Sequence, residues 1–218
     1  YKDTYNDYIQ YKEQNSAMRK AKKIIKDFNG DTHKTVLFLS YKAENWNTMD
    51  NIYKKYCQEK DIKVIVQCVP YYYKNIDGTF EKYIDGGMYP EYVTITPIED
   101  YNYVNENPDV IVFQYPYDNY NSAGTTDPVF YSYNLASHTQ KLIYIPYFRT
   151  DEIDENDMRA YTNMDAYVTM PGVVYADKVI VQSEEIRKLY IKKLTDFFGE
   201  ESEDEWEDKI EAEDIGGI

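Results

Sequence analysis

Four tyrosines each follow a short apolar run, and they are the first residues whose type and spacing suggest chemistry. Proline has no amide hydrogen for a sheet ladder, so it ends a strand and leaves the next residue just beyond it. Ligands of open α/β sheets bind beyond the carboxyl ends of the strands. The phenols therefore either line a ligand crevice or cap the core with their hydroxyls in water. The endings are Leu39-Ser40-Tyr41, Val69-Pro70-Tyr71, Tyr115-Pro116-Tyr117 and Ile145-Pro146-Tyr147.

Other polar and aromatic residues stand next to these endings. A lysine just past a strand suits a phosphate or carboxylate, and aromatic faces suit sugar or polyol rings, whose hydroxyls an aspartate can bond. We therefore expect a polyhydroxylated, phosphorylated ligand. No nucleophile stands beside a base, so no catalytic residue is assigned. The candidate substrate-binding residues are Tyr41, Lys42, Trp46, Tyr71, Tyr72, Asp77, Tyr117 and Asp118.

Strand and helix patterns alternate along the chain and would position these residues. Apolar runs predict strands at 36–41, 62–71, 92–96, 109–117, 141–148 and 175–183. Apolar residues at helical spacing predict helices at 5–28, 44–58 and 184–198. A loop with turn signals at Asp77-Gly78 and Gly86-Gly87 separates the second and third strands. This order predicts an α/β fold, a three-layer Rossmann-like domain with a mostly parallel, doubly wound sheet.

Composition divides the chain into three parts: an N-terminal helix (1–30), the Rossmann-like domain (31–198) and an acidic segment (199–218). Residues 200–214 hold ten acids and one lysine, so they carry −9 of the net charge of −15. Such a block repels itself, and we expect a frayed or partly helical tail or the start of an interdomain linker. It could bind a basic partner, although Trp206 and Ile210 stand at helical spacing as if to pack.

The basic residues of the N-terminal helix allow two interpretations. Five of them fall within one short stretch, and they form either a solvated face or a surface for a phosphate polymer or a membrane. The solvated face is the simpler interpretation, because charge runs on helices usually face water. The five are Arg19, Lys20, Lys22, Lys23 and Lys26.

Several kinds of partner and cofactor are not expected. The negative charge argues against nucleic acid, and the chain has neither a P-loop nor a GxGxxG turn after its first strand. Two cysteines and two histidines leave little for a metal site. The acidic run Asp151, Glu152, Asp154, Glu155 and Asp157 could bind a divalent cation or be a solvated loop or helix start. With no signal peptide and no apolar run near the roughly 20 residues of a membrane span, we expect a cytoplasmic protein.

The same stretches resemble the amino-terminal part of the CDP-glycerol glycerophosphotransferase family, which includes the teichoic-acid primases and polymerases. The resemblance covers residues 35–195. Gln114-Tyr115 stands where the most similar branch commonly has His-Asn. The resemblance rests on VLFLSYKAENWNTMDNIY (36–53), VPYYYKNIDGTF (69–80), MYPEYVTIT (88–96), NPDVIVFQYPYDNYNS (107–122), LIYIPYF (142–148) and GVVYADKVIVQSEEIRKLYI (172–191).

This resemblance implies the acceptor-side half of a two-domain GT-B glycosyltransferase-like enzyme. In that family a second Rossmann-like domain, not present in these residues, binds the CDP-glycerol donor and carries most catalytic groups. The implied partners are that donor domain and a polyol-phosphate or lipid-linked acceptor, with peripheral contact at the inner face of the cell membrane. The alternatives are a stand-alone sugar- or polyol-phosphate-binding module and a protein-interaction domain.

Overall fold

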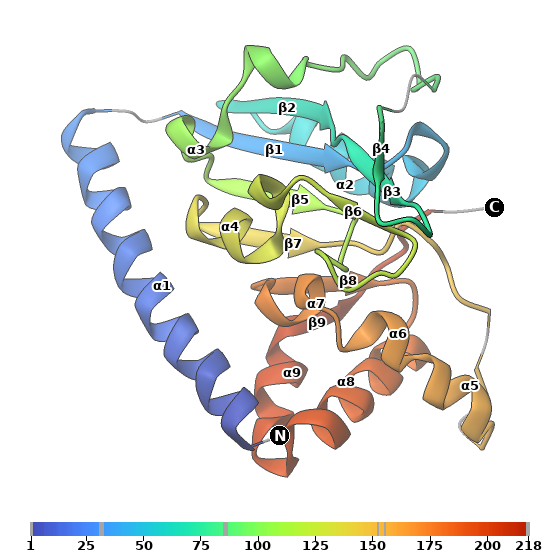
Figure 1. The fold of residues 1–218 in the computed structure, drawn as a ribbon. Coiled ribbons are helices and arrows are strands. Elements are labelled where there is room, and N and C mark those ends of the chain that lie inside the picture. Colours follow the sequence, from blue (N-terminus) through green and yellow to red (C-terminus); the bar gives the residue numbers. More distant parts are fainter. Residues whose placement is uncertain (1, 31–32, 85–86, 152, 155, 217–218) are drawn as a thin grey trace.

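A six-stranded parallel sheet forms the centre of the computed structural model, which describes residues 2–30, 33–84, 87–151, 153–154 and 156–216, with side chains from residue 6 (Figure 1). The strand order is β2-β1-β5-β7-β8-β9, and every neighbouring pair is parallel. This confirms the predicted α/β, Rossmann-like three-layer fold. The strands are β1 (Lys34–Ser40), β2 (Ile62–Cys68), β5 (Val110–Phe113), β7 (Lys141–Tyr144), β8 (Lys178–Val181) and β9 (Ile210–Ala212).

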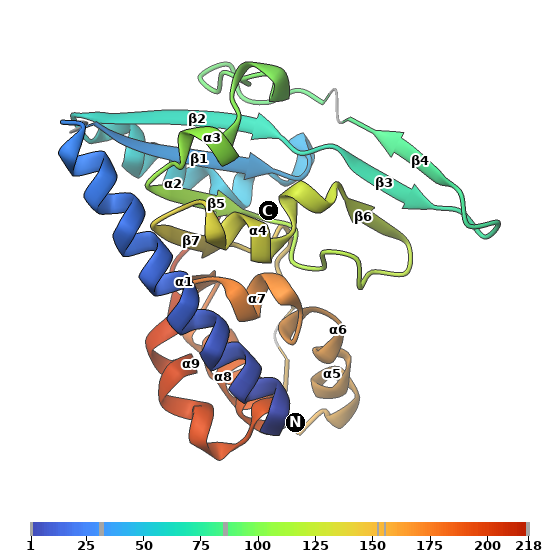
Figure 2. The ribbon, with the colours of Figure 1, turned by 60° about the vertical axis from the view of Figure 1, so that its left-hand side comes forward.

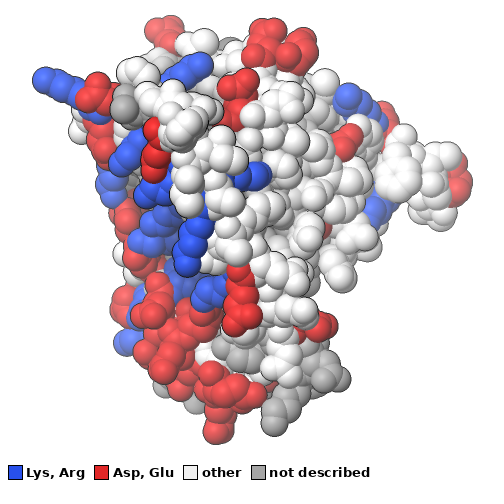
Figure 3. Space-filling view, turned by 90° about the vertical axis from the view of Figure 1, so that its left-hand side faces the viewer, with Lys and Arg blue, Asp and Glu red and all other residues white. Residues whose placement is uncertain are grey.

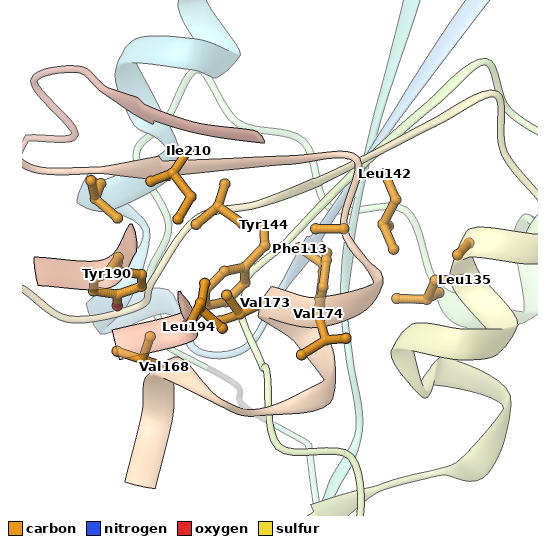
Figure 4. Close-up of a cluster of buried hydrophobic side chains, with 14 of the residues drawn as sticks. Phe113, Leu135, Leu142, Tyr144, Val168, Val173, Val174, Tyr190, Leu194 and Ile210 are labelled. Atoms are coloured by element: carbon orange, nitrogen blue, oxygen red, sulfur yellow. The ribbon is translucent and has the colours of Figure 1, made fainter. Parts of the chain in front are cut away.

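Alternate residues of these strands feed two separate hydrophobic layers. On one face, Phe113 and Tyr144 pack with Val173 and Leu194 of the covering helices (Figure 4). On the other face, Phe38 packs on α2 (Asn47–Gln58). The first face is covered by α4 (Ser132–Ser137), α6 (Asp165–Val168), α7 (Pro171–Tyr175) and α8 (Glu184–Phe198), with α3 (Tyr103–Glu106) and α5 (Met158–Asn163) at its periphery.

The strand predicted at 92–96 is wrong. This stretch forms a single bridge between Ile95 and Val66, with one backbone hydrogen bond from the Thr96 amide to the Val66 carbonyl (2.8 Å). It runs beside the outer strand β2, and Pro97 follows at once, so the pairing cannot extend. The other predicted strands are present, although most are shorter than their apolar runs.

A second, antiparallel sheet replaces the loop expected after residue 71. It consists of β3 (Tyr71–Lys74), β4 (Phe80–Tyr83) and β6 (Gly124–Thr126), in the order β4-β3-β6. The predicted turn at Asp77-Gly78 joins β3 to β4, and Gly78 has a φ of 83°, in the left-handed region that suits glycine. The β3–β4 hairpin projects beyond the central sheet (Figure 2). Gly86, the start of the second turn signal, lies outside the described residues.

The described part of the acidic segment is partly helical, as one of the alternatives had it, but it is packed against the domain and is not frayed. After a short 3₁₀ turn at Glu200–Ser202, it forms α9 (Glu203–Lys209) and then β9, which adds to the sheet beside β8. The side chains of Trp206 and Ile210 are fully buried, as their spacing suggested. Folding is possible because the helix turns most of its acids toward water and its few other residues inward.

The N-terminal helix α1 (Lys2–Phe28) is present as predicted, but its faces are not those expected. Arg19, Lys22 and Lys26 bond to the body of the protein rather than to water: Arg19 to Asp177 (2.6 Å), Lys22 to the Ser137 carbonyl (2.8 Å) and Lys26 to Asp109 (2.7 Å). Ile24, Ile25 and Phe28 are instead 68%, 60% and 90% exposed. Figure 3 shows Lys and Arg gathered on this side of the molecule above a group of Asp and Glu. No helix in the described ranges is long and apolar enough to cross a bilayer.

Candidate functional site

The strand-end tyrosines converge into one group of rings, which we call the phenol cluster: Tyr41, Tyr71, Tyr115, Tyr117 and Tyr147. The Tyr41 ring lies at its centre, with centroid distances of 4.9 Å to Tyr71, 5.0 Å to Tyr115 and 5.1 Å to Tyr147. The Tyr117 and Tyr147 hydroxyls are 3.4 Å apart. Parallel strands end at the same edge of a sheet, so residues far apart in sequence meet here.

Gln114, at the end of β5, holds the backbone beneath the cluster. Its Oε1 accepts a hydrogen bond from the Tyr41 amide (3.0 Å). Its Nε2 donates to the Asn45 carbonyl and to the Thr48 hydroxyl, both at 2.9 Å. This fully buried amide therefore ties the turn after β1 to the neighbouring strand. An uncharged side chain with a donor and an acceptor suits that position.

Lys42 places a cation on the cluster. Its Nζ is 5.4 Å from the ring centroids of both Tyr41 and Tyr71, within the range of a cation–π contact. The nearest carboxylate is that of Glu44, at 3.6 Å, and the Glu44 side chain is 71% exposed. An ion pair this exposed is worth little, so the ammonium remains available to a phosphate.

The cluster combines buried rings with partly exposed ones. Tyr71 and Tyr115 are buried, whereas Tyr41, Tyr117 and Tyr147 are partly exposed. The void beneath Tyr41, of about 10 Å³, holds no more than a water molecule. A ligand would therefore lie across the outer rings and Lys42, and the buried rings would support them from below.

Burial keeps these phenols neutral. It raises the pKa of Tyr41, Tyr71, Tyr115 and Tyr117 well above the usual range of a tyrosine. Neutral hydroxyls donate and accept hydrogen bonds, but they are poor nucleophiles and poor bases near pH 7. These hydroxyls are therefore suited to hydrogen bonding with a ligand.

Four predicted site residues lie elsewhere or are committed to structure: Trp46, Tyr72, Asp77 and Asp118. Trp46 is only 2% exposed, because it packs between Phe38 and Tyr53 in the core, and its Nε1 donates to Asp50 (3.1 Å). Tyr72 lies away from the phenol cluster, since side chains alternate along β3. Asp77 is exposed in the hairpin turn, where its carboxylate accepts hydrogen bonds from the Thr79 amide and hydroxyl.

Asp118 is buried beneath the site and faces the core. Its Oδ1 accepts hydrogen bonds from the Ser132 amide (2.9 Å) and the Ser132 hydroxyl (2.8 Å). Burial raises the pKa of this carboxyl to about 6, although the bonds from Ser132 act in the opposite direction. Asp118 thus connects the loop after β5 to the start of α4.

Gln114, Tyr115 and Tyr147 belong to this edge but are not among the candidate substrate-binding residues, although Tyr147 is one of the four strand-end tyrosines. Tyr115 stands directly before Pro116, so the rule that selected the residue after each proline passed over it. Its ring nevertheless contacts both Tyr41 (5.0 Å) and Tyr117 (5.2 Å). If every residue of the strand end Gln114-Tyr115-Pro116-Tyr117 is taken as a candidate, Gln114 and Tyr115 are found from the sequence.

The acidic run after β7 forms no metal site in the described part of the chain, where no three His, Cys, Asp or Glu residues come together around one point. Asp157 instead caps α5, because its Oδ1 accepts hydrogen bonds from the amides of Arg159 and Ala160, both at 3.0 Å. This agrees with the helix-start interpretation. Glu152 and Glu155 lie outside the described residues.

Comparison with known proteins finds no relative of this chain. The chain matches no protein-family model, no curated protein and no solved structure.

Proposed function

We propose that this chain is a sugar- or polyol-phosphate-binding domain that acts as the acceptor-side half of a glycerophosphotransferase or related glycosyltransferase of cell-wall polymer synthesis. The observation that carries the proposal is the phenol cluster with Lys42 above it. Partly exposed aromatic faces accept the apolar faces of sugars and polyols, and an ammonium beside them accepts a phosphate. The fold and the sequence resemblance support the choice of enzyme class.

The chemistry of the intact enzyme defines what this domain would do. An acceptor hydroxyl would attack the β-phosphate of CDP-glycerol, the bond to the CMP phosphate would break, and CMP would leave. The residues described here would hold the acceptor, with Tyr41, Tyr117 and Tyr147 against its carbon skeleton and Lys42 on its phosphate. The donor would come from a second domain. Incubation of the chain with CDP-glycerol and a polyol-phosphate acceptor should therefore release no CMP, and CMP release would refute the half-enzyme proposal.

Binding at the cluster is tested by titration with a short glycerol-phosphate oligomer, followed by calorimetry. We expect saturable binding that Lys42→Met weakens about tenfold, the effect of one charge-assisted hydrogen bond. Tyr41→Leu should weaken it as well, because the central ring is lost. Lys63→Met and Tyr120→Leu are matched controls at exposed positions outside the cluster. Binding that is absent, or unchanged in Lys42→Met, would contradict the proposal.

A peripheral contact with anionic membranes is a second part of this proposal. It rests on the outward side of α1, where the exposed Ile24, Ile25 and Phe28 lie beside Lys20 and Lys23. We expect the chain to sediment with vesicles of phosphatidylglycerol and not with vesicles of phosphatidylcholine. Ile24→Ser combined with Phe28→Ser should abolish the association, because neither side chain packs in the core. Equal sedimentation of this variant would count against a role for α1.

A further inference from the structure

A separate pocket lies on the other face of the antiparallel sheet, beneath the projecting hairpin. Its volume is about 210 Å³, smaller than the roughly 300–1,000 Å³ that suits a drug-sized ligand. Tyr72 of β3 and Lys82 of β4 form one wall. The opposite wall comes from the 3₁₀ turns Ile98–Asp100 and Pro128–Phe130 and from the residues that flank them.

The pocket is preformed by hydrogen bonds in its base and walls. The fully buried Gln67 donates from Nε2 to the carbonyls of Pro97 and Tyr101, both at 3.0 Å, and so fixes the loop that carries Ile98. The Tyr103 hydroxyl donates to the Val129 carbonyl and holds the facing turn. Ile98, Val129 and the Phe130 ring then supply an apolar surface inside the pocket.

Two opposite charges line this pocket without pairing to each other. Lys82 makes no ion pair or hydrogen bond within the described ranges. Asp127 uses Oδ1 to accept from the Val129 amide (3.1 Å), and its other carboxylate oxygen has no partner there. The strand register explains their separation: Lys82 is opposite Tyr72, Tyr72 is opposite Thr125, and Asp127 follows β6. Two strand spacings, about 10 Å, and an offset of two residues along β6 therefore keep the charges apart.

We propose that this pocket binds a free amino acid with an aliphatic or aromatic side chain. The α-carboxylate would pair with the Lys82 ammonium, the α-ammonium would pair with the Asp127 carboxylate, and the side chain would lie against Ile98, Val129 and Phe130. A ligand that carries both charges satisfies both groups, whereas a simple anion or cation leaves one of them unpaired. Tyr72 and Tyr101 also line the pocket, and a tyrosine hydroxyl can donate a hydrogen bond to a carboxylate. This inference stands apart from the proposed function, because it uses none of the phenol cluster.

Calorimetry with L-phenylalanine and L-leucine tests the proposal on the full chain. 3-Phenylpropionate lacks the ammonium and phenethylamine lacks the carboxylate, and each should bind about tenfold more weakly than phenylalanine. Lys82→Met and Asp127→Asn should weaken phenylalanine binding by a similar factor. Asparagine keeps an oxygen that can accept from the Val129 amide, so the turn is preserved.

Matched controls separate this pocket from the rest of the molecule. Lys63→Met removes an exposed lysine elsewhere, and Glu81→Gln changes the residue next to Lys82 that points to the other face of β4. Neither should alter phenylalanine binding. Lys42→Met should also leave it intact, so failure here is distinguishable from failure at the phenol cluster. The proposal is overturned if neither amino acid binds, if the two singly charged analogues bind as well as phenylalanine, or if both pocket variants bind normally.

Discussion

Asp118 shows how one buried carboxyl can shape both the loop and the pH response of the protein. It occupies the left-handed backbone region, with φ of 48°, where asparagine and aspartate are the common residues after glycine. Only 6% of its surface is exposed, and its bonds to Ser132 are its connection to α4. It is a structural residue beneath the phenol cluster, although its sequence position suggested contact with ligand.

Asp118→Asn should remove a pH dependence of stability. Between the ordinary carboxyl pKa of 3.8 and the raised value of about 6, the folded chain keeps a proton that the unfolded chain has released. The wild type therefore loses stability as pH rises through this window. Between pH 4 and pH 7, we expect the free energy of unfolding of the asparagine variant to increase relative to that of the wild type by on the order of 2 kcal/mol.

Urea unfolding at both pH values measures this difference in the free energy of unfolding. Asp61→Asn, at an exposed left-handed position, controls for the substitution itself. Asp118→Ala should be destabilised at both pH values, because the Ser132 amide loses its acceptor. Parallel pH curves for wild type and Asp118→Asn would show that this carboxyl does not titrate as described.

Residue by residue, the sequence predicts which types gather at the sheet edge better than it predicts which way each one points. Tyr41, Tyr71, Tyr117 and Tyr147 meet because parallel strands share an edge, a rule that needs only the strand assignments. Trp46 is different, since it follows the 3₁₀ turn Ala43–Asn45, and the direction of a side chain there depends on how α2 docks on β1. Local spacing carries no information on that docking.

At the level of elements, polar contacts join α1 to the end of the chain. Lys209 of α9 is buried, and its Nζ donates to the Tyr8 hydroxyl (2.8 Å) and the Val174 carbonyl (2.7 Å). The Tyr8 ring stacks on Trp206 at 5.7 Å, and the Tyr8 hydroxyl donates to Glu205 (2.9 Å). Glu205 also pairs with Lys12.

Lys209→Met should remove a rise of stability with pH. Burial lowers the pKa of Lys209 to about 7, so above pH 7 the unfolded chain keeps a proton that the folded chain lacks, and stability rises with pH. Between pH 7 and pH 9, we expect the free energy of unfolding of the wild type to increase relative to that of the variant by on the order of 2 kcal/mol. Urea unfolding measures it. The control is Lys193→Met, which removes a buried lysine that pairs with Asp165 (3.0 Å). The rise of stability with pH should persist in this control. If Lys193→Met also lacks the rise, the rise does not come from Lys209.

Trp206→Ala tests whether the acidic segment belongs to the folded core. The indole is fully buried, and its Nε1 donates to the Ser202 hydroxyl (2.8 Å). We expect a loss of about 3–5 kcal/mol in the free energy of unfolding, typical of removing a large buried aromatic. Glu207→Ala, at an exposed position of the same helix, should change stability little. A loss below about 1 kcal/mol in Trp206→Ala would mean that the segment is only loosely attached.

Five of the six strands of the central sheet are predictable from the sequence, because continuous apolar runs belong to strands buried on both faces, whereas the short strand β9 has no such run. The small antiparallel sheet is not, since β3 reads Tyr-Tyr-Tyr-Lys and β4 reads Phe-Glu-Lys-Tyr, without regular alternation. The packing of the acidic segment is hard to predict from its composition for a related reason. Net charge dominates its composition, while two residues, Trp206 and Ile210, decide its packing.

For the whole molecule, the distribution of charge is as informative as the total of −15. Ion pairs such as Arg19–Asp177 and Lys26–Asp109 hold α1 to the body, whereas the excess of acids in the molecule is a source of repulsion. Salt weakens both effects at exposed positions. Whether salt raises or lowers stability therefore depends on the balance between ion pairing and repulsion over the whole surface.

We expect added salt to stabilise the whole protein, because the net charge of −15 should produce more repulsion among the acids than the exposed ion pairs offset. Raising NaCl from about 10 mM to about 150 mM shortens the Debye length from roughly 30 Å to 8 Å. The melting midpoint should rise by a few degrees, the shift that about 1 kcal/mol produces in a chain of this size. Hydrogen exchange of α1 should become faster in the same experiment, since its ion pairs weaken. A melting midpoint that falls with added salt would mean that the ion pairs contribute more to stability than the repulsion among the acids removes.

The bond between Tyr8 and Lys209 joins residues 201 positions apart, which has a consequence for biosynthesis. A ribosome adds about 5–20 residues per second, so α1 waits roughly 10–40 s before its partner helix is made. A helix that docked through a wide apolar face would be prone to aggregate during that delay. The docking face of α1 combines the rings of Tyr8 and Tyr11 with lysine, arginine and asparagine side chains, and these polar groups keep much of the helix hydrated on the nascent chain.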